Sequence, residues 1–342
     1  MHLQSTATAA LFCALATALP AETAPQSPTL ETATPLGVFA VEGTQSDFKT
    51  TSSRLAIPLS VGLNVSAYVN NASSATLVGF NAWTGGVVTV DIAEQGGASV
   101  APSSGPSIAG TSPSPSATNY QPGPHALRLT LRGTPGSRGL IEMWATGGLS
   151  APGSITGGYQ IDVGEDQSLE FDAPLLGFTR QSLVVRIPAS GTLPILLRSE
   201  AKATQTAVGS FLYSSGMSLR FTPAPLHQAH AYGATCGPEL AGTATPSGTD
   251  VVFDVKLTKG TPLAAGLLVV GTTPIEVAVP GIQCQLLTVP LITLGFSIDA
   301  QGAAGWQFRV PLVIEFDLRL QAAELGVQLA TASHGLHVVN LR

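Results

Sequence analysis

The stretch YQIDVGEDQSLEFD, residues 159–172, shows most directly which kind of fold this chain adopts. Apolar and polar residues alternate on either side of a Gly-Glu-Asp-Gln segment, as they do in two half-buried strands joined by a turn. The stretch therefore predicts a β-hairpin whose acids face outward. The side chains expected to face inward are Tyr159, Ile161, Val163, Leu169 and Phe171.

The same alternation recurs along the rest of the chain, with Gly or Pro between the segments. Helical spacing of apolar residues occurs only near the N-terminus and, for one short turn, near residues 321–325. We therefore expect an all-β protein built from tandem antiparallel β-sandwich modules, jelly-roll or immunoglobulin-like in type. The alternating segments are 55–59, 63–69, 87–92, 127–131 and 141–144 before the hairpin, and 183–187, 193–197, 208–213, 217–221, 251–257 and 314–320 after it.

The composition supports this fold class and narrows the range of partners. Gly and Pro account for 37 and 25 of the 342 residues, which argues against a helical bundle, and 44% hydrophobic residues argue against disorder. With 15 Lys and Arg against 21 Asp and Glu, the net charge is -6 and no basic stripe could neutralise phosphates. We expect no nucleic-acid partner.

An apolar segment near the N-terminus predicts export. Residues 7–19, ATAALFCALATAL, are too few to cross a bilayer as a helix, and they end at small residues that suit signal peptidase. No Lys or Arg precedes the segment, so the terminal amine and His2 are its only cations. We expect a cleaved signal peptide over residues 1–21 and a secreted protein, at the cell surface or outside the cell, with the periplasm as the alternative.

Composition also divides the remaining chain. We expect a flexible lead-in over residues 22–35, a β-sandwich region of one or two modules over 36–225, and a C-terminal β-sandwich over 228–342. Residues 99–119, rich in Ser and Pro, are expected to form an exposed loop. Residues 277–298 carry no charge, but two prolines and a glycine interrupt them, so we expect strands there and no integral membrane segment after signal cleavage.

Two cysteines, Cys236 and Cys284, remain once the signal peptide is removed. In an oxidising compartment they favour one structural disulfide, which would close a loop of about 49 residues and stabilise the fold by about 4 kcal/mol. A pair of inert buried thiols is the alternative. Neither cysteine belongs to a CxxC motif, so a metal or redox site is not expected.

The C-terminal third resembles the C-terminal module of many secreted proteins from planctomycete-type bacteria. The matching motifs are Tyr232-Gly233-Ala234-Thr235-Cys236-Gly237, Gly281-Ile282-Gln283-Cys284, Gly302-Ala303-Ala304 leading to Val310-Pro311, Val327-Gln328-Leu329, and Ser333-His334-Gly335-Leu336. The resemblance implies a β-sandwich, export and a disulfide between the two cysteines. It implies no chemistry.

Three groups of residues are candidate sites. Trp83, with Asn81 and Thr84 beside it in a Gly-bounded turn, could stack on a sugar ring or pack in the core. The His pairs 227/230 and 334/337 would share one face of a helix, but in strands their side chains point to opposite faces, so solvated loop positions are the preferred interpretation. A dense group of acids could hold calcium through oxygen ligands, although a solvated hairpin end explains it more simply; these are Asp162, Glu165, Asp166, Glu170 and Asp172.

No motif identifies an enzyme. The sequence contains no Gly-x-Ser-x-Gly, no HExxH and no GxxxxGK, and a triad that meets only in space cannot be located from sequence. We therefore expect a non-enzymatic protein without cofactor, calcium being the one candidate ion, and with a structural or adhesive role. The expected partners are an envelope or extracellular polysaccharide, a surface protein, or a second copy through exposed edge strands. The alternatives are a carbohydrate-binding module using Trp83 and, third, a secreted hydrolase.

Overall fold

A computed structural model describes the chain over residues 28–34, 36–42, 45–51, 54–56, 61–69, 72–82, 86–100, 107–111, 124–150, 153–206, 208–234, 236–279, 284–325 and 331–342. Every regular element in these ranges is a β-strand and every strand pair is antiparallel, so the all-β prediction is confirmed. The helical turn expected near residues 321–325 is wrong, because these residues belong to a strand, β24 (Phe316–Leu325). The expected signal peptide, residues 1–21, lies outside the described residues.

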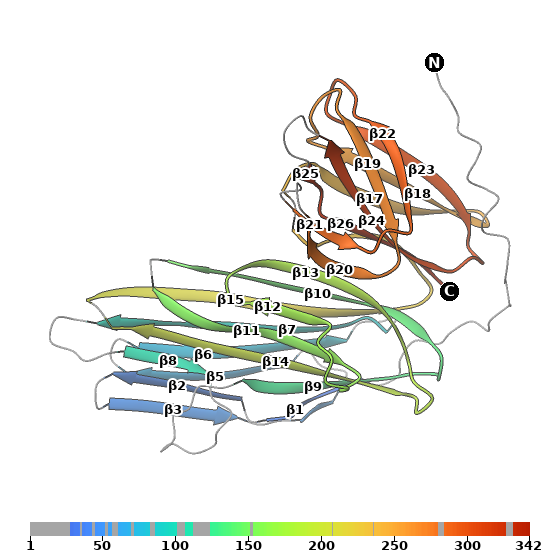
Figure 1. Cartoon of the computed structure of the whole chain (residues 1–342). Coiled ribbons are helices and arrows are strands. Elements are labelled where there is room, and N and C mark those ends of the chain that lie inside the picture. Colours follow the sequence, from blue (N-terminus) through green and yellow to red (C-terminus); the bar gives the residue numbers. More distant parts are fainter. Residues whose placement is uncertain are drawn as a thin grey trace.

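Two sheets form the larger, N-terminal sandwich (Figure 1). The first has the order β3 (Gln45–Thr51), β2 (Leu36–Glu42), β8 (Ser107–Thr111), β14 (Thr192–Gln205), β9 (His125–Arg132), β1 (Thr29–Thr32) and β4 (Arg54–Ala56), with β11 (Ser154–Val163) on β14 and β12 (Phe171–Pro174) on β11. The second has the order β13 (Gly177–Arg186), β10 (Arg138–Leu149), β15 (Gly209–Pro223), β7 (Val88–Val100), β6 (Ala72–Ala82) and β5 (Val61–Val69).

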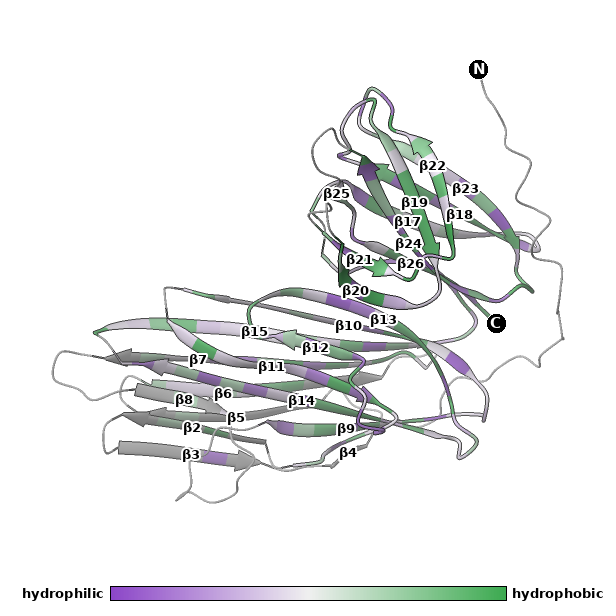
Figure 2. Cartoon of the chain, in the orientation of Figure 1, coloured by the Kyte–Doolittle hydropathy of each residue, from purple (hydrophilic) through white to green (hydrophobic). Residues whose placement is uncertain are grey.

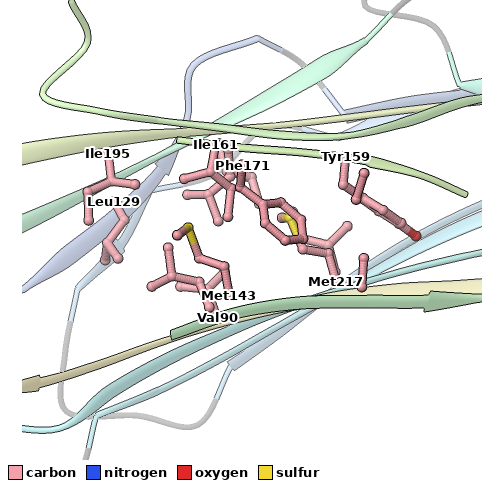
Figure 3. Packing of buried hydrophobic residues seen from close by; sticks show 14 of the residues in the cluster. Val90, Leu129, Met143, Tyr159, Ile161, Phe171, Ile195 and Met217 are labelled. Atoms are coloured by element: carbon pink, nitrogen blue, oxygen red, sulfur yellow. The ribbon is translucent and has the colours of Figure 1, made fainter. Parts of the chain in front are cut away.

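Among the described residues, the larger of two buried hydrophobic clusters between these sheets forms the main core (Figure 3). Leu129 and Ile195 come from the first sheet, and Val90, Met143 and Met217 come from the second. Each sheet combines strands from before and after the Ser/Pro-rich segment 99–119, so neither half of the region could bury its apolar face alone. The described part of residues 36–225 therefore folds as one sandwich.

The expected flexible lead-in, residues 22–35, is wrong for its described part. Residues 29–32 form strand β1, which pairs with β4 on one side and with β9 on the other. Leu30, opposite Leu129, is completely buried and belongs to the main core. A single leucine between Thr29 and Glu31 shows no alternation, yet it suffices for a strand when the strands on both sides supply backbone hydrogen-bond partners.

The expected exposed loop, residues 99–119, is also shorter than predicted. Strand β7 continues to Val100, and residues 107–111 form β8, which pairs with β2 and β14. Ala109 is completely buried there. Ala109 belongs to a small buried cluster between the two sheets, and backbone pairing stabilises the segment even though it contributes little apolar area. Residues 101–106 and 112–119 lie outside the described part of the chain.

The predicted hairpin over residues 159–172 is confirmed, because its two strands pair, but the predicted inward position of Leu169 in the loop is wrong. Strands β11 and β12 pair with Tyr159 opposite Ala173 and Ile161 opposite Phe171. Leu169, expected inward, is instead 42% exposed. The reason is the loop backbone, in which Glu165 and Gln167 have positive φ angles, so the two-residue alternation stops before it reaches Leu169.

The C-terminal sandwich begins after residue 225 and has a core of its own. Figure 2 shows the apolar character of β19 in its larger sheet. That sheet has the order β16 (Leu226–Tyr232), β26 (Gly335–Leu341), β24, β19 (Ala265–Gly271) and β22 (Ile292–Ser297), with β25 (Thr331–Ala332) on β24. It faces β17 (Glu239–Ser247), β18 (Asp250–Thr258) and β23 (Ala304–Pro311), and β20 (Pro274–Ala278) pairs with β21 (Gln285–Thr288).

A disulfide joins Cys236, which follows β16, to Cys284, which precedes β21, with 5.9 Å between the Cα atoms. The predicted pairing is confirmed. The stretch 277–298 consists of strands and short connections where it is described, as expected, although β22 is largely exposed. No helix among the described residues is long and apolar enough to cross a membrane.

Strand β26 joins the two sandwiches, because both of its faces are buried. Leu336 and Val338 point into the C-terminal core. Val339 and Leu341 point the other way and pack on Leu140 of β10 in a separate apolar cluster. The C-terminal sandwich thus lies on the outer face of the sheet that contains β10 and β13 (Figure 1), and the two sandwiches share a continuous buried junction.

Candidate functional site

The predicted sugar-binding turn lies at the limit of the described residues. Trp83 and Thr84 are outside them, and Asn81 lies at the end of β6, where its backbone pairs with Thr89 of β7. The carbohydrate-binding role of this turn stays a prediction.

The acidic hairpin differs from the prediction at Asp162, whose side chain is buried. Asp162, expected to face outward, is 1% exposed. Its carboxylate accepts the backbone N–H of Asp166 at 3.1 Å and that of Gln167 at 3.2 Å, so it holds the turn closed from inside. An Asp that satisfies backbone donors of its own turn is a structural residue. Alternation of apolar and polar residues could not predict the burial of Asp162, because it assigns each side chain to a face of the sheet and takes no account of nearby backbone N–H groups.

The other acids of the hairpin also have protein partners or face solvent. Glu165 forms an ion pair with Arg128, and this hydrogen bond raises the pKa of the guanidinium. The Ser168 hydroxyl lies 2.6 Å from Asp166 and 2.7 Å from Glu170, and its hydrogen bonds lower the pKa of the exposed Asp166. Asp172 is exposed on β12.

Glu170 also accepts the backbone N–H of Val163 at 2.7 Å. The described residues contain no group of three or more His, Cys, Asp or Glu side chains that could hold a metal ion, so the structure adds no support for a calcium site.

The four histidines singled out by their spacing lie in the C-terminal sandwich, and each has its own partner. His227 bonds to Asn340, and His230 bonds to Gln228 and lies 3.0 Å from Glu142 of the other sandwich. His334 lies 2.6 Å from the Leu240 carbonyl oxygen. The predicted position in solvated loops is wrong for three of them, because His227 and His230 lie half-buried in β16 and His337 is completely buried in β26.

His337 stands at the centre of a polar link between the two sandwiches. Its Nδ1 lies 2.6 Å from the hydroxyl of Ser182 on β13, and its Nε2 lies 2.6 Å from Asp317 on β24. Burial lowers the pKa of His337, and the bond to Asp317 only partly opposes this. The imidazole is therefore neutral at pH 7, so that Ser182 donates to Nδ1 and Nε2–H donates to Asp317.

The order hydroxyl, imidazole, carboxylate is that of a hydrolase triad. Here, however, the hydroxyl belongs to a buried residue in the middle of a strand and joins two packed modules. The arrangement accounts for the burial of the Ser182 hydroxyl and the His337 imidazole at the junction, while Asp317 stays partly exposed. Sequence reasoning could not find it, because Ser182 lies 155 positions from His337 and no motif surrounds either residue.

A second polar link surrounds Glu142 of β10, which is 4% exposed. His230 lies 3.0 Å and Arg180 lies 3.3 Å from its carboxylate. Burial raises the pKa of Glu142, but the hydrogen bond from His230 and the nearby positive charges outweigh it and lower the pKa overall. Glu142 is therefore ionised at neutral pH and holds the two sandwiches together beside the first link, because Glu142 lies opposite Ser182 and His230 lies opposite His337 in the strand pairing.

A cavity of about 280 Å³ opens beside these links, between the two sandwiches. Arg319 of β24 lines it, is 2% exposed, and donates from Nη2 to the Ser182 carbonyl oxygen at 2.7 Å. Its guanidinium carbon lies 5.0 Å from the ring centroid of Tyr232, a distance at which cation and ring attract. Burial raises the pKa of Tyr232 to about 12, although Arg319 opposes the shift.

A separate polar cluster lies inside the N-terminal sandwich. Glu94 of β7 is completely buried, and Thr76 and Ser199 donate to its carboxylate at 2.7 and 2.6 Å. His125 lies 3.0 Å from the same carboxylate. The sequence did carry a signal, because Glu94 continues the inward phase of Val88, Val90 and Ile92. Both sheets cover this cluster, so its polar groups satisfy one another inside the N-terminal sandwich.

Comparison with known proteins identifies no family. No family model matches the chain, and no curated protein matches it in sequence. A solved structure of Bifidobacterium dentium β-glucuronidase, complexed with coumarin-3-O-glucuronide, aligns with 94% of this chain and 49% of that chain at 8% identity and a TM-score of 0.22. This chain thus spans about half of that enzyme, and a similarity at this level supports no inference about activity.

Proposed function

We propose that the protein is exported and serves as a structural or adhesive element at the cell surface or outside the cell, without catalysing a reaction. The observation that carries the proposal is the junction formed by β26. A strand buried on both faces and tied by two polar links makes two sandwiches behave as one stiff unit. Stiff units of this kind suit a load-bearing or display role.

The disulfide adds support for the compartment. Disulfides persist in oxidising surroundings such as the periplasm and the extracellular space, and Cys236–Cys284 closes a long loop between two strands. Together with the N-terminal sequence, it favours export. The expected partner is an envelope or extracellular polysaccharide or a surface protein.

Co-sedimentation tests the proposal. Purified residues 22–342 would be mixed with the envelope of the producing cell and with several insoluble polysaccharides, each with calcium and with EGTA. Saturable retention on the envelope is the expected result, and retention on a pure polysaccharide would identify a sugar partner. Retention on none of these surfaces, together with turnover in an ester and glycoside substrate panel, would overturn the proposal in favour of a hydrolase.

A further inference from the structure

The junction contains a positive charge, on Arg319, that forms no ion pair among the described residues. The Arg319 side chain is buried. Its Nε has no hydrogen-bond partner, and its one hydrogen bond to a backbone group goes to the uncharged Ser182 carbonyl oxygen. A buried guanidinium without a counter-ion is costly, so an anionic group is the missing complement.

The cavity that Arg319 lines has a defined size and wall. Its volume of about 280 Å³ corresponds to about nine water-sized volumes, and hence to a ligand of roughly nine or ten non-hydrogen atoms. Met143 and Leu183 from the N-terminal sandwich and Ile275 from the C-terminal one give it an apolar side. The site therefore has room for a small molecule with a short apolar part.

The rim carries the opposite charge. Glu170 at the end of the acidic hairpin and Glu276 of β20 both line the cavity, and Glu276 is exposed to solvent. Gln181 lies between the sandwiches, with its amide 3.5 Å from the Glu276 carboxylate. A simple anion would meet two like charges at this rim, whereas a molecule with a positive end would be attracted to it.

We propose that this cavity binds a small zwitterion of the α-amino acid type. Its carboxylate pairs with Arg319, because the planar guanidinium fork matches a carboxylate in geometry. Its ammonium group lies at the rim near Glu276 and Glu170, and a short apolar side chain contacts the Met143 side of the wall. The site goes beyond the structural role, because it places a small-molecule ligand within the junction itself.

Titration calorimetry with matched probes tests this site. The probes are glycine, L-leucine and L-glutamine, with leucine methyl ester and N-acetyl-leucine as controls that each lack one of the two charges. We expect saturable one-to-one binding of at least one amino acid, and at least tenfold weaker binding of the corresponding control. No binding of any of the three amino acids, or equal binding of leucine and its methyl ester, would overturn the proposal.

Two variants test the contacts at the carboxylate end and at the ammonium end of the ligand separately. Arg319→Gln should weaken amino acid binding at least tenfold. If that variant fails to fold, Glu276→Gln decides, since this exposed rim residue should weaken leucine binding several-fold while leaving N-acetyl-leucine unchanged. Glu239→Gln is the matched control, because Glu239 pairs with Lys259 and does not line the cavity. Unchanged leucine binding in Glu276→Gln would contradict the assigned orientation.

Discussion

The junction makes a quantitative prediction about Leu140. This side chain points out of the N-terminal sandwich, yet it is completely buried, because the C-terminal sandwich covers it with Val339 and Leu341. Leu140→Ala removes three carbon groups at about 0.8 kcal/mol each and leaves a cavity, so we expect the free energy of unfolding to fall by about 2–5 kcal/mol.

Urea denaturation of the full chain at pH 7 measures this loss. The matched control is Leu212→Ala in β15, since Leu212 is 63% exposed and its truncation should change the free energy of unfolding by about 0.5 kcal/mol or less. Equal effects of the two substitutions, or a loss below about 1 kcal/mol for Leu140→Ala, would refute the packed junction. In that case the two sandwiches would be joined only by the chain.

Three further predictions concern other parts of the fold. Replacing both Cys236 and Cys284 by Ser should lower the free energy of unfolding by about 4 kcal/mol, and an unchanged urea midpoint would contradict this. Because burial lowers the pKa of His337, the unfolded chain binds more protons below the usual value of 6.5, so stability should fall as the pH drops through this range. His337→Asn should flatten that slope in a pH series of melting curves; a slope identical to wild type would refute the assignment. Glu94→Ala should cost about 1–3 kcal/mol for each donor left unpaired, clearly more than Asp91→Ala on the exposed face of the same strand; equal losses would place Glu94 outside the interior.

The strand pattern was predictable wherever a strand has one buried and one exposed face. The hairpin over residues 159–172 followed from alternation alone, and so did the alternating segment 87–92, which lies in β7. The disulfide was predictable because only two cysteines follow the apolar N-terminal segment. These features depend on local spacing, which a sequence displays directly.

The remaining features depend on contacts that spacing does not encode. Leu30 becomes a core residue only because β4 and β9 lie on either side of it. Asp162 turns inward because its own turn presents two backbone donors. The cavity at Arg319 forms only where the two sandwiches meet, so no single segment of the sequence predicts it.

Strand β26 also limits how this protein can change over evolutionary time. In an ordinary strand of a sandwich, every second position faces solvent and accepts almost any polar residue. In β26 the even and the odd positions each fill a different interior, and His337 and Asn340 meet specific partners. A substitution anywhere in its seven residues must therefore be matched by a neighbour, so this short segment should diverge more slowly than any surface strand of the chain.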